Sequence, residues 1–315
     1  MSTVYSRIAG TGSYLPSRIV TNEELASTLD TSDGWIRAMT GIVQRRIAGD
    51  GESTVDMATV ASARALANAN VHARQLDLIV VATITPDLVF PSTAALLQAR
   101  LGARDVGAFD LSAACSGFMY GLALADGMIA SGRFKTALVV GAESMSRLLD
   151  WKDRSTCVLF GDGAAAVVLV SAANPGLRTF SLHADGSEPH LLCTPSKKSR
   201  FLHMDGGAVF KFAVRGLVEA GAETLEANNI TAESVDWVIP HQANLRIIDV
   251  CAKKLNVPKE KMVVTVDRHA NTSAASIPLA LDAAVTDGRV RSGNTVLLLS
   301  VGGGYTWAGG LINWD

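Results

Sequence analysis

The sequence lacks the features that mark several large classes of protein. Its four cysteines stand far apart and form neither the close pairs of a zinc site nor the density of a disulfide framework. We therefore expect no metal ion and four reduced thiols, at Cys115, Cys157, Cys193 and Cys251. The formal net charge of the 315 residues is only −2, which argues against a nucleic-acid partner or a charged tail.

Long apolar runs are absent as well. No stretch approaches the roughly 20 apolar residues that cross a bilayer, and residues 1–16 lack the basic segment and apolar run of a signal peptide. We therefore expect a cytoplasmic protein with no membrane partner. Hydrophobic residues still make up 48% of the chain, which is ample for one large domain or two packed domains.

Short apolar runs alternate with segments of helical periodicity along the first half of the chain. Such runs, bounded by turn residues, are typical of strands that are covered on both faces. The alternation predicts an α/β fold with mainly parallel pairing, to which antiparallel strands are added. We expect strands at 5–14, 77–83, 106–111, 137–141 and after a glycine turn within 157–170, and helices that begin near Thr21, Ser32, Ser53, Ser92 and Gly117.

The second half repeats this order. Residues 235–239 are similar to 76–80, and 291–301 to 131–141, so the strands follow similar turn residues in both halves. This indicates an internal duplication, with related halves at residues 1–172 and 173–315 and a site between them. The irregular segment 175–207 marks the boundary and is typical of an insertion near a functional cleft. We expect further strands at 236–240, 262–266 and 296–301, and helices at 210–228, 244–255 and 273–287.

Cys115 stands where a predicted strand passes into a predicted helix. A thiol at this place points at the unpaired backbone N–H groups of the first helical turn, whose partial positive charge favours the thiolate. A lowered pKa would make Cys115 a nucleophile. The alternative is a small buried core residue, because free cysteine is among the most buried residue types.

Three stretches in the second half offer partners for such a nucleophile. His241 follows the strand at 236–240, Asn271 precedes a helix rich in small residues, and three glycines at 302–304 follow the last buried strand. Each also has a structural interpretation, as a satisfied core histidine, a helix cap and a tight turn. All three follow strand ends, where ligands bind open α/β sheets.

Together these motifs resemble β-ketoacyl-acyl-carrier-protein synthase III, the initiating condensing enzyme of bacterial type II fatty acid synthesis. The resemblance runs from end to end and implies the thiolase fold, with two duplicated halves and mixed sheets in a layered αβαβα arrangement. It also implies a homodimer, a catalytic set of Cys115, His241 and Asn271, and no metal or redox cofactor. The matching motifs are residues 114–118, 160–164, 241–246, 271–276 and 302–307.

The resemblance implies a reaction in two steps. Cys115 attacks the thioester of a short acyl-CoA primer and forms an acyl-enzyme. His241 and Asn271 then donate hydrogen bonds to the thioester oxygen of malonyl-acyl-carrier protein as carbon dioxide leaves. The backbone N–H groups of Cys115 and Gly303 form the oxyanion hole.

The resemblance also implies binding residues for coenzyme A and the acyl group. Trp35 matches the position that stacks on the adenine, Arg154 a basic position, and Asn244 a contact to the pantetheine. Phe90 matches the position that limits the acyl pocket of the partner subunit, although a loop phenylalanine can also pack locally. Three positions depart from the common pattern, with Met39 in place of a second arginine and Ser155 and Ala270 in place of glycines.

A basic face is expected on the helix after His241. Arg246, Lys253 and Lys254 recur at about two helical turns, and Lys211 extends the patch. Such a pattern can be a solvated helix face. Because an acyl carrier protein is acidic, the resemblance favours carrier-protein docking.

Four alternative functions remain open. A condensing enzyme of secondary metabolism would share the catalytic set and use a different primer or acceptor. A thiolase is disfavoured because no second cysteine stands in the glycine-rich C-terminal stretch, and a non-catalytic partner subunit because all three catalytic positions are intact. A cysteine hydrolase would need water to reach the acyl-enzyme. The preferred primer is left open, because short acyl groups differ by about 0.8 kcal/mol of burial per methylene.

Overall fold

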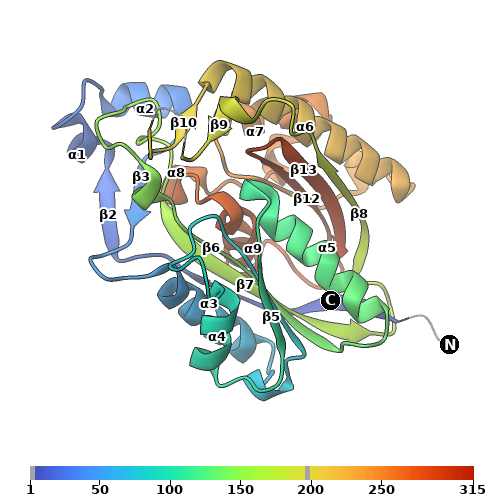
Figure 1. Ribbon diagram of the computed structural model, residues 1–315. Helices are drawn as coiled ribbons and strands as arrows, with labels where there is room; N and C mark the ends of the chain where they lie inside the picture. The colour runs from blue at the N-terminus through green and yellow to red at the C-terminus, as the bar shows by residue number, and fades with distance from the viewer. Residues whose placement is uncertain (1–3, 196–198) are drawn as a thin grey trace.

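The computed structural model describes residues 4–195 and 199–315, and its core is built on two sheets (Figure 1). In the first sheet β4 pairs in parallel with β5 and β6, and β7 lies antiparallel between β6 and β1. The strand order is β1 (Tyr5–Tyr14), β7 (Asp162–Ala172), β6 (Thr136–Ser144), β4 (Leu78–Ala82) and β5 (Gly107–Leu111).

The second sheet repeats this arrangement. β11 pairs in parallel with β12, and β13 lies antiparallel between β12 and β8. On the far side of β11, Met262 forms a single parallel bridge to Val238, at the place that β5 occupies in the first sheet. The predicted duplication of mixed sheets is therefore confirmed. The strand order is β8 (Leu177–Ala184), β13 (Thr306–Asn313), β12 (Thr295–Gly302) and β11 (Trp237–Pro240).

Two expectations about strands are wrong. Pairing is not mainly parallel, because four of the seven strand pairs in the two sheets are antiparallel. The turn 303–305 joins β12 directly to β13, and so short a connection permits only an antiparallel pair.

Residues 262–266 do not form the expected strand, because the Gln242 side chain takes the place of a neighbouring strand. Its amide oxygen accepts the N–H groups of Thr265 and Val266, and its amide nitrogen donates to the Val263 carbonyl.

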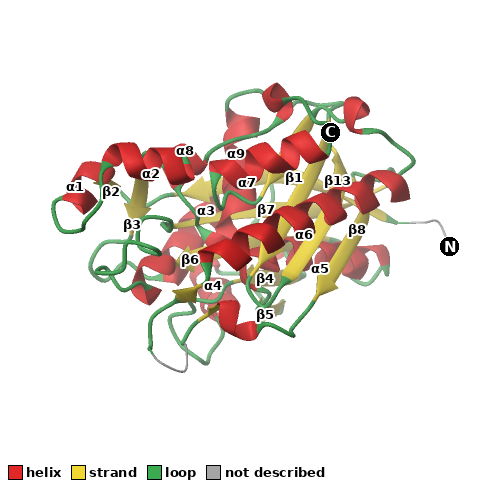
Figure 2. Ribbon diagram, turned by 90° about the horizontal axis from the view of Figure 1, so that it is seen from above, coloured by secondary structure: helices red, strands yellow, loops and turns green. Residues whose placement is uncertain are grey.

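Helices form three layers around the two sheets (Figure 1). The outer face of the first sheet packs on α3 (Thr54–Asn68) and α4 (Thr93–Leu101). Between the sheets lie α5 (Gly117–Ala130) and α9 (Ser276–Thr286), which share one apolar core with both inner faces. The outer face of the second sheet is covered by α6 (Gly206–Ala227) and α7 (Leu245–Lys254), which lie side by side (Figure 2). These five layers confirm the expected layered α/β arrangement.

Alternating side chains explain why both faces of each sheet are covered. In β12 the side chains of Val296 and Leu298 face the central helices, whereas Leu297 and Leu299 face α6 and α7. Successive residues of a strand point to opposite faces, so a continuous apolar run serves two cores. This arrangement places the ends of strands from both sheets around the first turns of α5 and α9.

The shorter elements surround one end of these layers. The helices α1 (Asn22–Ala26) and α2 (Asp33–Thr40) begin as predicted, with the Thr21 and Ser32 hydroxyls accepting backbone N–H groups. Segment 175–207 is more regular than its composition predicts, because it contributes β8 to the second sheet; residues 196–198 lie outside the described chain. The remaining elements are β2 (Arg18–Thr21), β3 (Gln44–Ile47), β9 (Leu192–Cys193), β10 (His203–Met204) and α8 (Val266–His269).

Candidate active site

Cys115 lies in a single 3₁₀ turn between β5 and α5. Ala114, just before it, has φ +48°, so the chain turns sharply as it leaves the strand. The end of β12 packs against this turn, and a Cβ at Gly302 would lie 2.8 Å from the Cys115 nitrogen. Only glycine permits so close an approach. The backbone N–H groups of Cys115 and Gly303 lie close enough to the Cys115 sulfur to lower the pKa of the thiol.

The predicted fall in the pKa of Cys115 is wrong. Burial raises the pKa of the thiol to about 11 and outweighs the hydrogen bonds from Ser273 and from the two N–H groups, which lower it. The buried carboxyl of Glu143 acts in the same direction as burial. Cys115 is therefore a thiol at neutral pH and must lose its proton to act as a nucleophile.

His241 stands at the end of β11, and its side chain is only 2% exposed. Burial lowers the pKa of its imidazole to about 4, so the ring is neutral at physiological pH. Its Nδ1 atom lies 2.6 Å from the Ser276 hydroxyl oxygen, which accepts the N–H group of Gln242 at 3.4 Å. When the Ser276 hydroxyl donates to Nδ1, the ring proton sits on Nε2, and in this tautomer His241 is a neutral hydrogen-bond donor toward the cavity.

Asn271 is held by the segment that enters β7. Its N–H group donates to the Leu159 carbonyl at 2.9 Å, and its carbonyl accepts the N–H group of Gly161 at 3.0 Å. A Cβ at Gly161 would lie 2.9 Å from the His269 carbonyl oxygen, so this contact requires glycine. The Asn271 side-chain oxygen accepts the N–H group of Ser273 at 2.9 Å. The amide nitrogen of Asn271 is the group left to act as a donor.

The three predicted catalytic residues line one cavity of about 450 Å³. A second cavity, of about 610 Å³, lies on the other side of Cys115 and also reaches Gly303. Cys115 therefore borders two cavities, both lined mainly by apolar surface, and the first also has charged side chains such as Arg154 and Arg246 in its lining. The apolar side chains of the second cavity include Ile84, Leu111, Met145, Phe160, Leu192 and Leu202.

The residues predicted to bind coenzyme A line the first cavity. The Arg154 guanidinium lies 5.2 Å from the centroid of the Trp35 ring, so both stand at the same mouth. Asn244 is partly engaged within the chain: its oxygen caps α7 through the Arg246 N–H group, and its nitrogen donates to the Met39 carbonyl. One amide hydrogen and one lone pair of Asn244 are left for a ligand.

Phe90 lies away from both cavities. Its side chain is 83% exposed in the loop before α4, and the neighbouring Val89, not Phe90, lines the second cavity. Leu88 and Val89 are exposed beside it. A single chain therefore presents an apolar loop at the edge of the second cavity.

The expected basic face is exposed on α6 and α7. Lys211 and Arg246 stand at the mouth of the first cavity, and Lys253 and Lys254 follow in the last turn of α7. In the described part of the chain, none of these four side chains takes part in an ion pair. Because no described acidic side chain pairs with them, their positive charges can interact with a partner.

Sequence reasoning missed several residues that build the site. Ser276 orients His241, Gln242 fixes the loop that carries it, and Ser273 links Cys115 to Glu143. Ser273 and Ser276 belong to the same motif as Asn271, which was the available signal. Glu143 lies near the end of an apolar strand. A single carboxyl within a buried run was the signal in the sequence that could have identified it.

Two further features are absent from the described part of the chain. Within residues 4–195 and 199–315 no cluster of three or more histidine, cysteine, aspartate or glutamate side chains is arranged to hold a metal. The helices in those ranges are all too short or too polar to span a membrane.

The chain is similar to known proteins along its whole length. The model of the 3-oxoacyl-[acyl-carrier-protein] synthase III family matches residues 109–186, and the model of that family's C-terminal part matches residues 225–314. The β-ketoacyl-[acyl-carrier-protein] synthase III of Xanthomonas campestris pv. campestris is 54% identical over 99% of each chain.

Solved structures show the same likeness. The 3-oxoacyl-[acyl-carrier-protein] synthase III from Aquifex aeolicus VF5 is 48% identical, with a TM-score of 0.95 over 98% of this chain and 100% of that chain. The priming β-ketosynthase from the R1128 polyketide biosynthetic pathway is 39% identical, with a TM-score of 0.96 over 100% of this chain and 98% of that chain.

Proposed function

The chain belongs to the 3-oxoacyl-[acyl-carrier-protein] synthase III family of condensing acyltransferases, and from this premise we propose that it joins an acyl-CoA primer to malonyl-acyl-carrier protein. The products are 3-oxoacyl-acyl-carrier protein, coenzyme A and carbon dioxide, and the primer is acetyl-CoA. The reaction initiates fatty acid synthesis. One observation carries the proposal: Cys115, His241 and Asn271 line a single cavity, with two backbone N–H groups directed at the sulfur.

In the first step Cys115 attacks the primer thioester. The primer enters through the first cavity, with its nucleotide end against Trp35 and Arg154 and its acyl chain in the apolar second cavity beyond the sulfur. The N–H groups of Cys115 and Gly303 stabilise the tetrahedral oxyanion, a contact worth about 3 kcal/mol per donor. Coenzyme A leaves, and the acyl group stays on Cys115.

In the second step malonyl-acyl-carrier protein loses carbon dioxide. The thioester oxygen accepts hydrogen bonds from the His241 Nε2–H group and from the Asn271 amide, which stabilise the enolate as it forms. Both donors are neutral, so they bind the developing negative charge without first supplying a proton. The enolate carbon attacks the acyl group and expels the Cys115 sulfur. The reaction uses no metal or redox cofactor.

Two surfaces fit the partners of this reaction. The exposed basic side chains of Lys211, Arg246, Lys253 and Lys254 suit an acidic acyl carrier protein at the cavity mouth. The exposed apolar loop of Leu88, Val89 and Phe90 suits a second copy of the chain, so we propose a homodimer in which Phe90 limits the acyl pocket of the partner subunit.

The proposal is tested by incubating the protein with radiolabelled acetyl-, propionyl- and isobutyryl-CoA, with and without malonyl-acyl-carrier protein. We expect covalent labelling that is lost in C115A and retained in C251A, since Cys251 is fully buried and lines neither cavity. A 3-oxoacyl product is expected only when the malonyl substrate is present. Release of free acid, or labelling that survives in C115A, contradicts the proposal.

A second candidate is a priming synthase of polyketide synthesis. It is supported by the 39% identity to the priming β-ketosynthase of the R1128 pathway. The same primer panel separates the two functions. A strong preference for a longer or branched primer, with poor use of acetyl-CoA, would favour the second.

A further inference from the structure

A carboxyl group that forms no ion pair with any described residue lies behind the Cys115 turn. Glu143 stands one residue before the end of β6, and its side chain is 0% exposed. One carboxyl oxygen, Oε2, accepts hydrogen bonds from the Thr83 hydroxyl at 3.2 Å, the Ile84 N–H group at 3.1 Å and the Thr85 hydroxyl at 2.6 Å. The other, Oε1, accepts the Ser273 hydroxyl at 3.0 Å. The reaction steps given above do not use this buried acid.

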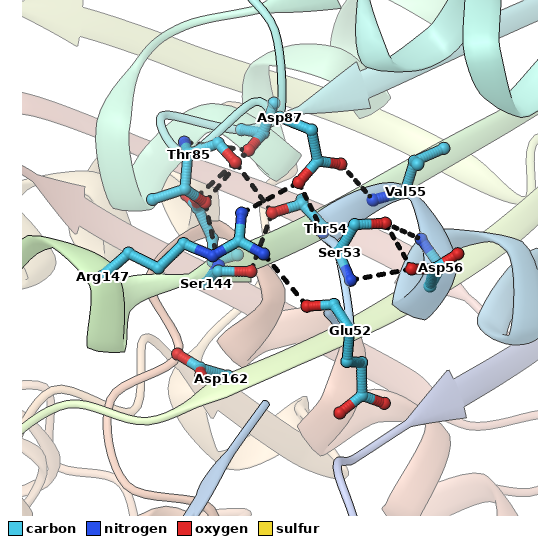
Figure 3. A network of polar contacts seen from close by, with 12 residues as sticks. Glu52, Ser53, Thr54, Val55, Asp56, Thr85, Asp87, Ser144, Arg147 and Asp162 are labelled. Atoms are coloured by element: carbon cyan, nitrogen blue, oxygen red, sulfur yellow. Dashed lines mark hydrogen bonds and ion pairs between the residues drawn. The ribbon is translucent and has the colours of Figure 1, made fainter. Parts of the chain in front are cut away.

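Thr85, one of the donors that hold Glu143, is itself held in a network of hydrogen bonds (Figure 3). The Thr85 hydroxyl oxygen accepts the N–H group of Ser144, and the Thr85 carbonyl accepts the Thr54 hydroxyl. Asp87 accepts the Thr54 N–H group and also pairs with Arg147. The loop therefore cannot turn its donors away from Oε2. Oε1, which faces Ser273, is the oxygen that remains available for a proton.

Ser273 connects this carboxyl to the nucleophile. It opens the 3₁₀ turn before α9 with φ +51°, and this turn packs against the 3₁₀ turn that carries Cys115. The hydroxyl donates to Glu143 and also lies close enough to the Cys115 sulfur to lower the pKa of the thiol. Cys115 and Ser273 both line the second cavity, whereas Glu143 lines neither cavity. The Glu143 carboxyl is therefore buried away from solvent, and the Ser273 hydroxyl lies between it and the Cys115 thiol.

We propose that Glu143 takes up the Cys115 proton through Ser273 when the acyl-enzyme forms, and returns it when the sulfur is expelled. Ser273 is a positioning and proton-transfer residue, and Glu143 is the proton store. The inference rests on the proposed function, because it requires Cys115 to be the nucleophile.

The protons and bonds balance over both steps. As the bond between the Cys115 sulfur and the acyl carbon forms, the thiol proton passes to the Ser273 oxygen, and the Ser273 proton passes to Oε1 of Glu143. The bond from the acyl carbon to the coenzyme A sulfur breaks, and the coenzyme A thiolate takes a proton from water. In the condensation a carbon–carbon bond forms and the Cys115 sulfur leaves. It recovers its proton from Glu143 by the same route in reverse.

The acidities of the groups fit this exchange. Burial raises the pKa of Glu143 to about 7, so near neutral pH its carboxyl can both accept and release a proton. Burial lowers the pKa of His241 to about 4, which makes that imidazole the weaker base. The groups that face Glu143 are the hydroxyls of Thr83, Thr85 and Ser273, the Ile84 N–H group and the Cys115 thiol. Of these, Cys115 is the one that titrates.

The experiment measures the rate of acylation of Cys115 by acetyl-CoA, by rapid mixing and intact-protein mass spectrometry across neutral pH. In the unchanged protein we expect the rate to rise with pH to a plateau above about 7, as Glu143 ionises. In E143Q the amide oxygen can keep the contacts to Thr83 and Thr85 while its NH₂ group donates to Ser273, so the base is removed without a cavity. We expect acylation about a hundredfold slower and no plateau near pH 7.

S273A breaks the link and leaves the carboxyl in place, so we expect a similar loss of rate. D126N is the control, because Asp126 is a half-buried carboxyl that also accepts a serine hydroxyl but lines neither active-site cavity. Its acylation rate should match that of the unchanged protein.

Two outcomes would overturn the inference. If Glu143 acted only through its charge, E143Q would remove a negative charge beside the thiol and acylation would be faster. Acylation at the unchanged rate and with the unchanged pH profile in both E143Q and S273A would exclude the relay as well. If E143Q fails to fold, as judged by circular dichroism, S273A decides the question. If the unchanged protein is not acylated at Cys115 at all, it is the proposed function that fails.

Discussion

The Nδ1 atom of His241 lies 2.6 Å from the hydroxyl oxygen of Ser276, the first residue of α9. The same hydroxyl oxygen accepts the Gln242 N–H group. When Ser276 donates to Nδ1, the neutral imidazole carries its proton on Nε2, which is the tautomer that the proposed decarboxylation step requires. Ser276 lines neither cavity, so it would act on the proposed reaction through His241.

S276A should slow the decarboxylation of malonyl-acyl-carrier protein by about tenfold. The loss is smaller than the roughly hundredfold or greater loss on deleting a donor, because the imidazole remains and only its tautomer preference is relaxed. Acylation of Cys115 should be unchanged. The ¹⁵N chemical shifts of the His241 ring should show a larger share of the Nδ1–H form.

The control for S276A is S62A. Ser62 is a buried serine of α3 whose hydroxyl has no hydrogen-bond partner in the described structure. S62A should leave both half-reactions unchanged. Equal losses of acylation and decarboxylation in S276A would instead indicate a general structural effect and contradict the tautomer role.

Ala270 occupies a backbone conformation that suits glycine. Its φ of +59° and ψ of −162° place it in a region that is essentially restricted to glycine, at a cost of about 1–3 kcal/mol. A270G relieves this strain but loses a buried methyl group, worth about 0.8 kcal/mol, and adds backbone entropy to the unfolded chain. We expect the free energy of unfolding to rise by about 1 kcal/mol, measured by urea titration.

The matched control for A270G is A275G. Ala275 is equally buried but has ordinary right-handed helical angles, with φ −76° and ψ −15°. A275G should therefore lower the free energy of unfolding by about 1 kcal/mol. A loss of stability in both variants would show that Ala270 is not strained.

The resemblance of its motifs to a known family predicted Cys115, His241 and Asn271 as the catalytic set, and the fold explains why the three line one cavity. Cys115 and His241 follow the strands β5 and β11, Asn271 precedes the 3₁₀ turn before α9, and such ends converge in a duplicated α/β fold. Glu143 stands in an apolar run that identifies a buried strand but not the neighbours of its one carboxyl. Its partner Ser273 is 130 residues away, and this contact depends on how the two sheets pack.

Tertiary contacts also determine two features that the local sequence pattern does not predict, the conformation of residues 262–266 and the pKa of Cys115. The run Met262–Val266 has the β-branched composition of a strand, yet its backbone groups are satisfied by the side chain of Gln242. The pKa of Cys115 likewise depends on the tertiary structure. The helix-terminus effect was evident in the sequence, but the burial that outweighs it was not.

The thiol of Cys251 predicts how stability changes in alkali. Burial within α7 raises its pKa from 9.0 to about 12, so the folded chain keeps this proton at pH values where the unfolded chain loses it. The resulting stabilisation is fully present below pH 9 and is lost as the pH rises toward 12. At pH 10 the loss is about 1.4 kcal/mol.

C251A removes this titration. Relative to the unchanged protein, its free energy of unfolding should fall by about 1.4 kcal/mol less between pH 8 and pH 10, measured by urea titration in the presence of a reducing agent. C251A is also expected to be less stable at pH 8, because it loses a buried sulfur. An identical fall in both proteins would contradict the assignment.

The basic residues of α7 predict how the carrier protein is recognised. Lys253 and Lys254 are exposed and unpaired within the described chain, and they lie about two helical turns from Arg246 at the cavity mouth. The double variant K253E/K254E should raise the KM for malonyl-acyl-carrier protein about tenfold, which corresponds to about 1.4 kcal/mol. The effect should weaken at high salt, since exposed charges are screened.

Acylation of Cys115 by acetyl-CoA should not change in K253E/K254E, because neither lysine lines the first cavity. R133E is the control for a change of surface charge: Arg133 is exposed beyond the C-terminal end of α5, whereas Cys115 precedes its N-terminus. A helix of 14 residues is about 21 Å long, so Arg133 lies far from the cavity mouth. A KM for malonyl-acyl-carrier protein that rises equally in both variants would show that overall charge, not the face of α7, guides the carrier protein.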